Sequence, residues 1–335
     1  MEHIPTVNII LTLISVFLVA LGIYLMYAYS KNQKHREVYK GEYSKLSLIF
    51  PFKPGIGIKN DLLGFLLSVY FWGIGLIIIV AYAFLLYKNL PNTTEFMISF
   101  VAAGGIALGF SFMYTVIMWF IDKKKREPLR FVPTLFLIGS ISTFVATFAN
   151  EFGENMLGII WQNNTEIIAI ALLAPLIEEV IKGVGVWVMS FHHEMKNMMD
   201  GILYGFVIGA GFSFIENCGY YVIYSPFDIG LEAWLSLVVL RTLGGGLFHG
   251  VFTALTGAMI GLIKSNSLNK KFLIFSFLPA IFAHVIFNTI TVLDKISNIT
   301  NKEICGVLLV FVILLFGIFA YLVKDALERE KKERK

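Results

Sequence analysis

The stretch Ala174-Pro-Leu-Ile-Glu-Glu-Val-Ile-Lys182 places two carboxylates and an ammonium in the middle of a long run of Ile, Leu, Val and Ala. The whole run, residues 167–189, is long enough to cross a hydrocarbon core of about 30 Å. An ionised side chain at membrane depth costs at least about 2.5 kcal/mol and is tolerated mainly where it faces a partner or a water-filled cavity. We therefore interpret this stretch as one wall of a functional site, against the alternative of a structural ion pair between helices.

The composition places the chain among membrane proteins. It has 57% hydrophobic and only 15% charged residues, with 31 Phe among 335 residues, which is far too apolar for a soluble globular domain. Apolar runs that can span a bilayer occur at 7–29, 62–87, 95–121, 131–149, 167–189, 201–224, 234–263, 272–291 and 305–323. We therefore predict an all-α protein, a polytopic transmembrane helical bundle of about nine spans.

The basic residues predict how these spans are oriented. Of the 27 Lys and Arg residues, 22 lie in the segments 30–61, 122–130, 190–200, 264–271 and 324–335. The loops on the opposite side hold three, and the remaining two, Lys182 and Arg241, lie inside spans. The positive-inside rule then places the N-terminus outside and the C-terminus in the cytoplasm. Because this asymmetry accounts for most of the basic residues, the net charge of +4 gives no reason to expect a nucleic-acid partner.

The ionisable residues at membrane depth divide the chain into three parts. Spans 1 to 4 carry none, whereas spans 5 to 8 carry all of them. We predict a supporting part with spans 1 to 3 and cytoplasmic loops at 1–130, and a core of spans 4 to 8 at 131–292. The last span and a charged cytoplasmic tail occupy 293–335, and the tail is predicted to be a solvated helix end.

The two adjacent glutamates share one cation. On a helix that advances 100° per residue, Lys182 lies about 40° from Glu178 and about 60° from Glu179. It can neutralise one carboxylate while the other turns toward a different neighbour. The glutamates can then have different charge states and different roles.

Further polar residues lie at a similar depth in the next three spans: Glu216 with Asn217, then Arg241 and His249 around Gly244-Gly-Gly246, then His284 with Asn288. Counting residues from the span ends places the glutamates and histidines at one level to within about 5 Å. We therefore expect these side chains to share a single cavity.

This set of side chains suits peptide hydrolysis. A carboxylate can take a proton from an attacking water and pass it to the leaving amine, and a His or Asn donor can stabilise the oxyanion. With a metal, Glu216, His249 and His284 would form a two-His, one-carboxylate zinc set, and Glu178 would be the base. Without a metal, the same residues would work as a glutamate protease. The sequence leaves both mechanisms open.

Four motifs occur in a fixed order on successive spans: Glu178-Glu179-x-x-Lys182, Phe212-x-x-x-Glu216-Asn217, Arg241 with His249, and His284-x-x-x-Asn288. In this order they resemble the PrsW family of intramembrane proteases. More distantly, they resemble the CAAX-processing proteases, which carry Glu-Glu, Phe-x-x-x-His and His-x-x-x-Asn motifs. The resemblance covers about residues 130 to 292.

The resemblance implies a multi-pass protease of a prokaryotic plasma membrane that hydrolyses a membrane-anchored protein of the anti-sigma factor type. The catalytic residues that it implies are Glu178, Glu179, Glu216, His249, His284 and Asn288, supported by Lys182, Asn217 and Arg241. Glu216 stands where the CAAX pattern has a histidine, which favours a metal-ligand or shared-proton role for this carboxylate. Which of the paired glutamates is the base stays open, as does the oligomeric state.

Two other functions compete with a protease. A proton- or cation-coupled transporter would use intramembrane Glu, His and Lys equally well, but spans 1 to 4 lack the second set of polar, broken helices that an inverted repeat predicts. A non-catalytic membrane scaffold is the other alternative, because a related fold is shared with the APH subunit of gamma-secretase. A scaffold would require the acidic pair to be dispensable.

Overall fold

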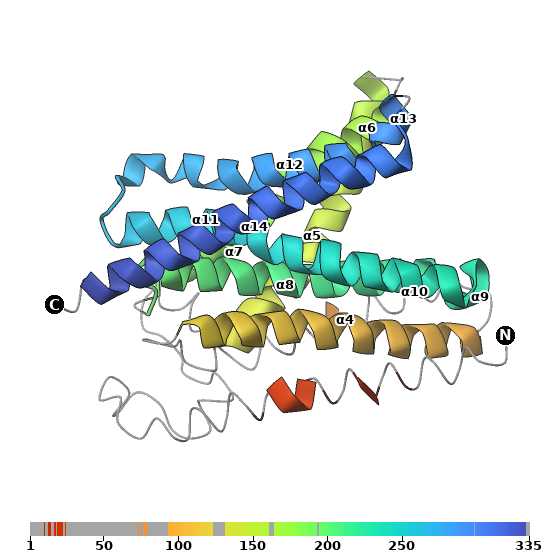
Figure 1. Ribbon diagram of the computed structural model, residues 1–335, viewed down its shortest axis with the longest axis horizontal. Coiled ribbons are helices and arrows are strands. Elements are labelled where there is room, and N and C mark those ends of the chain that lie inside the picture. Colours follow the sequence, from red (N-terminus) through yellow and green to blue (C-terminus); the bar gives the residue numbers. More distant parts are fainter. Residues whose placement is uncertain are drawn as a thin grey trace. The chain divides into compact units, whose positions relative to one another are not determined.

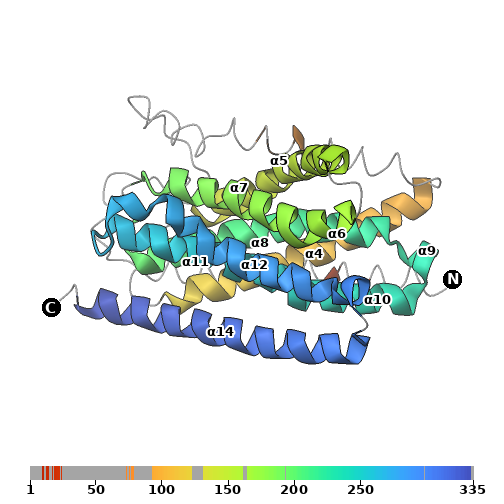
Figure 2. The same cartoon turned by 90° about the horizontal axis from the view of Figure 1, so that it is seen from above.

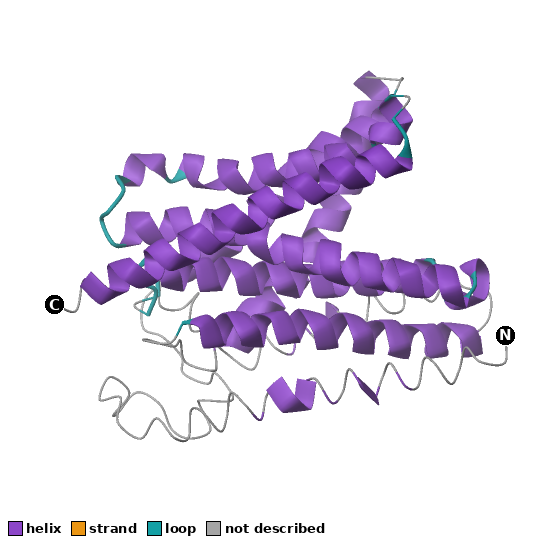
Figure 3. Ribbon diagram, in the orientation of Figure 1, coloured by secondary structure: helices purple, strands orange, loops and turns teal. Residues whose placement is uncertain are grey.

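The computed structural model describes residues 93–122, 131–160, 164–192, 194–297 and 299–332, with scattered positions between residues 10 and 78. Apart from those positions, the predicted spans 7–29 and 62–87 lie outside the described residues. Helices joined by loops and turns make up the described part, and it contains no strand (Figure 3). The all-α prediction is confirmed for these residues.

The helical segments, with π-helical and 3-10 segments written η, are α4 (Thr93–Ile121), α5 (Phe131–Ile160), α6 (Thr165–Ile168), η2 (Ala169–Leu173), α7 (Ala174–Met189), α8 (Met198–Ile223), α9 (Pro226–Ile229), α10 (Leu231–Leu240), η3 (Arg241–Gly246), α11 (Leu247–Lys264), η4 (Lys270–Phe272), η5 (Ile274–Phe277), α12 (Leu278–Thr291), α13 (Leu293–Ile296) and α14 (Asn301–Lys332). Six stretches of the described chain are long and apolar enough to cross a membrane: Met97–Ile121, Phe131–Ile160, Met198–Ile223, Leu231–Lys264, Ile274–Thr291 and Asn301–Lys332. They correspond to six of the seven spans predicted from residue 95 onward.

The seventh predicted span, 167–189, is helical throughout as α6, η2 and α7. It is not among the six apolar stretches, and it differs from them in carrying two carboxylates and an ammonium in its centre. Its crossing of the membrane therefore stays a prediction, as do the count of about nine spans and the orientation of the termini.

One span is longer than predicted. The polar sequence from Asn150 onward suggested that the span ends at residue 149, but α5 continues to Ile160. Asn150 is therefore a helical residue, and its side chain is available to a neighbouring helix. This matters for the site described below.

The chain forms two compact units, which are described separately. The first comprises residues 1–141 and 210–248, and the second comprises residues 142–209 and 249–335. The division into 1–130, 131–292 and 293–335 stays a prediction.

In the first unit, a hydrophobic core joins α4, the end of α8 and α10 (Figure 1). Ala103 and Ile106 of α4 pack with Tyr221 of α8 and Trp234 of α10, all of them buried. The Trp234 indole N–H donates to the Tyr221 carbonyl at 2.9 Å. The buried aromatic pair thus has its polar group satisfied.

In the second unit, glycines let α8 and α11 touch backbone to backbone. Gly201, Gly205 and Gly209 recur every four residues, so they lie along one face of α8. A Cβ at Gly205 would overlap the Thr253 carbonyl, and a Cβ at Gly209 would overlap the His249 carbonyl. Small residues of this kind allow close helix contact in membranes.

The remaining helices of the second unit surround this pair. α12 contacts α7, η2 and α14, and Figure 2 shows it alongside them. The charged tail continues α14 as a helix, but the prediction that it is simply solvated is wrong at Glu330. This residue is 4% exposed, and it accepts a hydrogen bond from Asn197 at 2.9 Å. Glu330 follows the buried Val323 and Ala326 on one helix face, which turns it inward.

Candidate functional site

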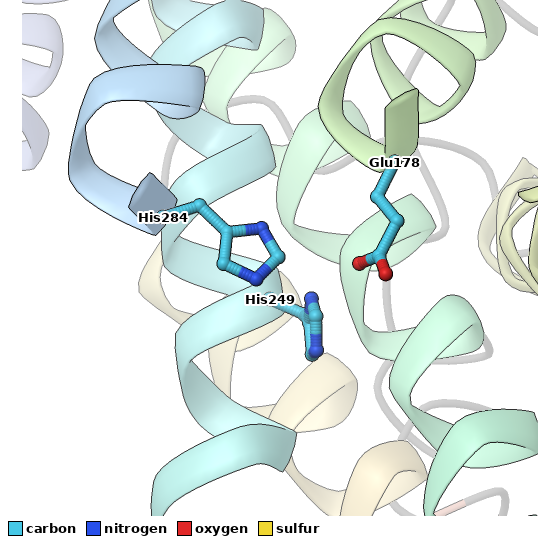
Figure 4. A group of neighbouring side chains, drawn as sticks. All are labelled: Glu178, His249 and His284. Atoms are coloured by element: carbon cyan, nitrogen blue, oxygen red, sulfur yellow. The ribbon is translucent and has the colours of Figure 1, made fainter. Parts of the chain in front are cut away.

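Three helices of the second unit bring a carboxylate and two imidazoles together. Glu178 of α7, His249 of α11 and His284 of α12 point toward one another (Figure 4). One potential ligand atom from each lies within 4.8 Å of the others, and all three residues are buried. The structure therefore brings together three of the predicted site residues.

Glu179 is fully buried and has a different environment from Glu178. Its Oε1 accepts from Lys182 Nζ at 2.5 Å and from His284 Nδ1 at 3.0 Å. Its Oε2 accepts from Thr253 Oγ1 at 3.1 Å. Both oxygens are thus engaged by groups from three helices, so this carboxylate connects α7, α11 and α12.

Glu178 has different polar partners. Asn150 Nδ2 donates to its Oε1 at 3.3 Å, and Lys182 Nζ lies 4.0 Å from its Oε2. Lys182 is therefore much closer to Glu179, as expected of a cation that distinguishes the two carboxylates. Of the pair, Glu178 is the carboxylate that stands beside both histidines.

The hydrogen-bond partners determine which nitrogen of each histidine carries a proton. Lys182 Nζ lies 3.0 Å from His249 Nδ1, and because an ammonium can only donate, Nδ1 accepts and Nε2 carries the hydrogen. For His284 the order is reversed, because the Glu179 carboxylate can only accept and Nδ1 must donate. A neutral His284 then has its lone pair at Nε2. The two imidazoles thus offer opposite functions, a donor and an acceptor.

A metal at this site would find only part of its ligand set. His284 is arranged as metal-binding histidines usually are, with a carboxylate behind its Nδ1–H, and Glu178 offers a carboxylate oxygen. His249 has no lone pair at Nε2 while Lys182 donates to Nδ1. As hydrogen-bonded here, the trio does not fit a three-ligand metal centre. The ligand set predicted from the sequence had Glu216 in place of Glu178, and that assignment stays a prediction.

Asn288 bonds to backbone. Its Nδ2 donates to the Ile170 carbonyl of η2 at 2.9 Å. One turn earlier on the same helix, His284 bonds Glu179. α12 therefore contacts the helical run Thr165–Met189 through two polar side chains.

The other three predicted residues form a network in the first unit. The Arg241 guanidinium pairs with Glu216 at 3.0 Å and donates through Nε to Asn217 Oδ1 at 2.9 Å. It also lies over the Tyr220 ring, 3.6 Å from the centroid. Asn217 Nδ2 in turn donates to Ser213 Oγ at 3.1 Å. The carboxylate of Glu216 is thus neutralised by a cation, and its catalytic role stays a prediction.

Two polar contributors were missed from the sequence. Thr253 lies one turn after His249 on α11, so its i, i+4 spacing was a usable signal. Asn150 was placed beyond the end of a span, and only the longer α5 brings it to Glu178.

Comparison with known proteins identifies the family. The family model described as PrsW family intramembrane metalloprotease matches residues 127–320. The chain belongs to this family. The match contains all nine predicted site residues, and it confirms the resemblance drawn from the motifs between about 130 and 292.

Curated relatives agree with this family. A "Protease PrsW" of Geobacillus kaustophilus is 27% identical over 197 residues, 57% of this chain and 79% of its own length. One of Oceanobacillus iheyensis is 28% identical over 216 residues, covering 62% of this chain and 89% of its own. One of Shouchella clausii is 33% identical over 101 residues, 30% of this chain and 43% of its own. No solved structure matches the chain.

Family membership makes the chain a peptidase and, with the six apolar helices, a multi-pass membrane protein. It favours the protease over the transporter and the scaffold. The buried Glu178, His249 and His284 lie within the part of the chain that matches this family.

Proposed function

We propose that this protein is an intramembrane endopeptidase of the plasma membrane in which Glu178 activates a water molecule. The proposal rests on one observation: Glu178, His249 and His284 come from three helices, lie close together and are all buried. Proteolysis inside a membrane needs a base and a donor held together away from lipid, and this group supplies both.

Glu178 is assigned as the base because the Glu179 carboxylate is already hydrogen-bonded through both oxygens. Both Glu179 oxygens accept hydrogen bonds from Lys182, His284 and Thr253. Glu178 would take the proton of the attacking water as the water oxygen bonds to the carbonyl carbon. It would then pass that proton to the amine as the C–N bond breaks.

His249 is assigned to the oxyanion. Its Nε2 carries the hydrogen when Lys182 donates to Nδ1, so this N–H is the group that can donate to the oxyanion. A preorganised donor of this kind in a dry site contributes about 3 kcal/mol to transition-state stabilisation. His284, fixed by Glu179, has an acceptor that can orient the water. No step of this mechanism uses a metal.

The substrate class rests on the family resemblance. It is a membrane-anchored protein of the anti-sigma factor type, cleaved within or near the bilayer.

The test compares two Glu→Gln variants in purified protein with a membrane-anchored reporter. Glu178→Gln keeps the shape of the side chain but cannot take a proton, so we expect cleavage to fall by about 10²–10⁴-fold. The melting temperature in detergent should stay close to that of the parent protein. Glu166→Gln is the matched control, because Glu166 precedes the same helix, is exposed and pairs with an exposed Lys295. Full activity of Glu178→Gln would contradict the assignment.

The metal-free mechanism has its own test. Elemental analysis of the purified, active protein should show no stoichiometric metal, and a strong zinc chelator should leave cleavage unchanged. A stoichiometric zinc ion that is lost in His249→Gln, together with inhibition by the chelator, would overturn the metal-free mechanism and leave the peptidase assignment standing.

A further inference from the structure

The helix that carries the two glutamates is irregular just before them. In η2, the N–H of Ala174 donates to the carbonyl of Ala169, five residues back, instead of Ile170, four residues back. π-helical turns of this kind are often found at functional sites. As a consequence, the Ile170 carbonyl loses its regular α-helical donor.

The next residue removes the other backbone donor. In the i→i−5 pattern of η2, the partner of Ile170 would be the N–H of residue 175, which is a proline and has none. Neither Ala174 nor Pro175 can therefore satisfy this carbonyl. At membrane depth an unpaired backbone carbonyl is costly, because no water is present to replace the missing donor.

Asn288 supplies the donor from another helix. Its Nδ2 bonds the Ile170 carbonyl at 2.9 Å, while His284 on the same helix bonds Glu179. α12 is therefore bonded to the run Thr165–Met189 on both sides of Pro175. One bond thus holds the π-helical segment η2, and the other holds α7, which carries Glu178.

We propose that Asn288 is a positioning residue. Its amide replaces the N–H that Pro175 lacks, and so it stabilises the π-helical segment η2 that places Glu178 beside His249 and His284. Its effect on cleavage rests on the proposed role of Glu178, but its effect on stability does not. The family resemblance implied another role for Asn288, at the oxyanion or at a metal. The following experiment distinguishes that role from the one proposed here.

The experiment is a double-mutant cycle on the full-length protein with Asn288→Ala, Pro175→Ala and the double variant. Asn288→Ala should lower the melting temperature by several degrees and reduce cleavage roughly tenfold or more, because a partly buried acceptor that loses its donor shifts an equilibrium by about that factor. Pro175→Ala restores an N–H at the position that the π pattern needs. The double variant should therefore recover most of both losses.

A matched control uses a buried asparagine of the first unit. Asn217 Nδ2 also donates to a backbone carbonyl, that of Arg241 at 3.4 Å. Pro175→Ala should give no recovery when it is combined with Asn217→Ala, because the added N–H serves only Ile170.

Two results would overturn the proposal. One is a loss of cleavage in Asn288→Ala, with unchanged melting temperature, that Pro175→Ala does not recover; this would indicate direct contact with the reacting groups. The other is an Asn288→Ala variant with normal stability and normal cleavage. If the single variant does not fold, recovery of folded protein in the double variant supports the proposal, and failure to recover it counts against it.

Discussion

Glu178 and Glu179 are adjacent in sequence, but their carboxylates have different surroundings. Glu179 is held by an ammonium, an imidazole and a hydroxyl, whereas Glu178 accepts from the Asn150 amide and lies beside two histidines. Different partners at neighbouring positions are a common way to give two carboxylates different roles. These contacts support the proposal that Glu179 is structural and that Glu178 is the base.

At this scale the first prediction concerns Lys182, which is fully buried and bonds both Glu179 and His249. Lys182→Met removes one partner of a buried ion pair and leaves a negative charge uncompensated. We expect a loss of about 3–5 kcal/mol in the free energy of unfolding, measured by denaturant titration in micelles. The double variant Lys182→Met, Glu179→Gln should lose less free energy of unfolding, because the carboxylate that Lys182 neutralises is removed as well. Equal losses in both variants would show that the ion pair is not the cause.

At the scale of elements, irregular helices and glycine contacts position the site. η2 directly precedes α7, and η3 directly precedes α11, so a π-helical segment leads into each of these helices. Within the second unit, the glycine face of α8 lets α11 approach closely enough for backbone contact. α11 carries both His249 and Thr253. The close approach of α11 to α8 is therefore needed to place these two side chains in the site.

The second prediction tests this contact with Gly205→Ala. The added Cβ would overlap the Thr253 carbonyl, so α8 and α11 must separate. We expect a destabilisation of about 1–3 kcal/mol and a parallel fall in cleavage, because Thr253 bonds Glu179. Gly317→Ala on α14 is the control. A Cβ there meets nothing within 4 Å, and the change should be neutral or stabilising by up to about 1 kcal/mol. Equal effects at the two positions would contradict the packing argument.

At the scale of the whole molecule, the membrane topology gives the third prediction. The positive-inside rule places the loop 264–271 in the cytoplasm and the loop 292–304 outside. In a variant without Cys218 and Cys305, a single cysteine at Asn301 should react with a membrane-impermeant maleimide on intact cells. A single cysteine at Ser267 should react only after the cells are permeabilised. The reverse pattern would invert the topology and move the site toward the other leaflet.

The sequence by itself determined the class of the protein and the composition of its site. Hydropathy is a local property, so it located the helices from residue 95 onward, and the motifs around Glu178 and His284 indicated the family. Helix ends were less predictable, because polar residues such as Asn150 are tolerated where a neighbouring helix offers a partner.

Only the tertiary structure decided how these side chains combine. Counting along spans gives depth but not direction, so it could not show that Glu178 lies beside both histidines, nor that Glu179 is engaged on both oxygens. It also could not show that Asn288 bonds the carbonyl that Pro175 leaves without a donor. Such bonds depend on the rotation and packing of whole helices, which no single segment of sequence determines.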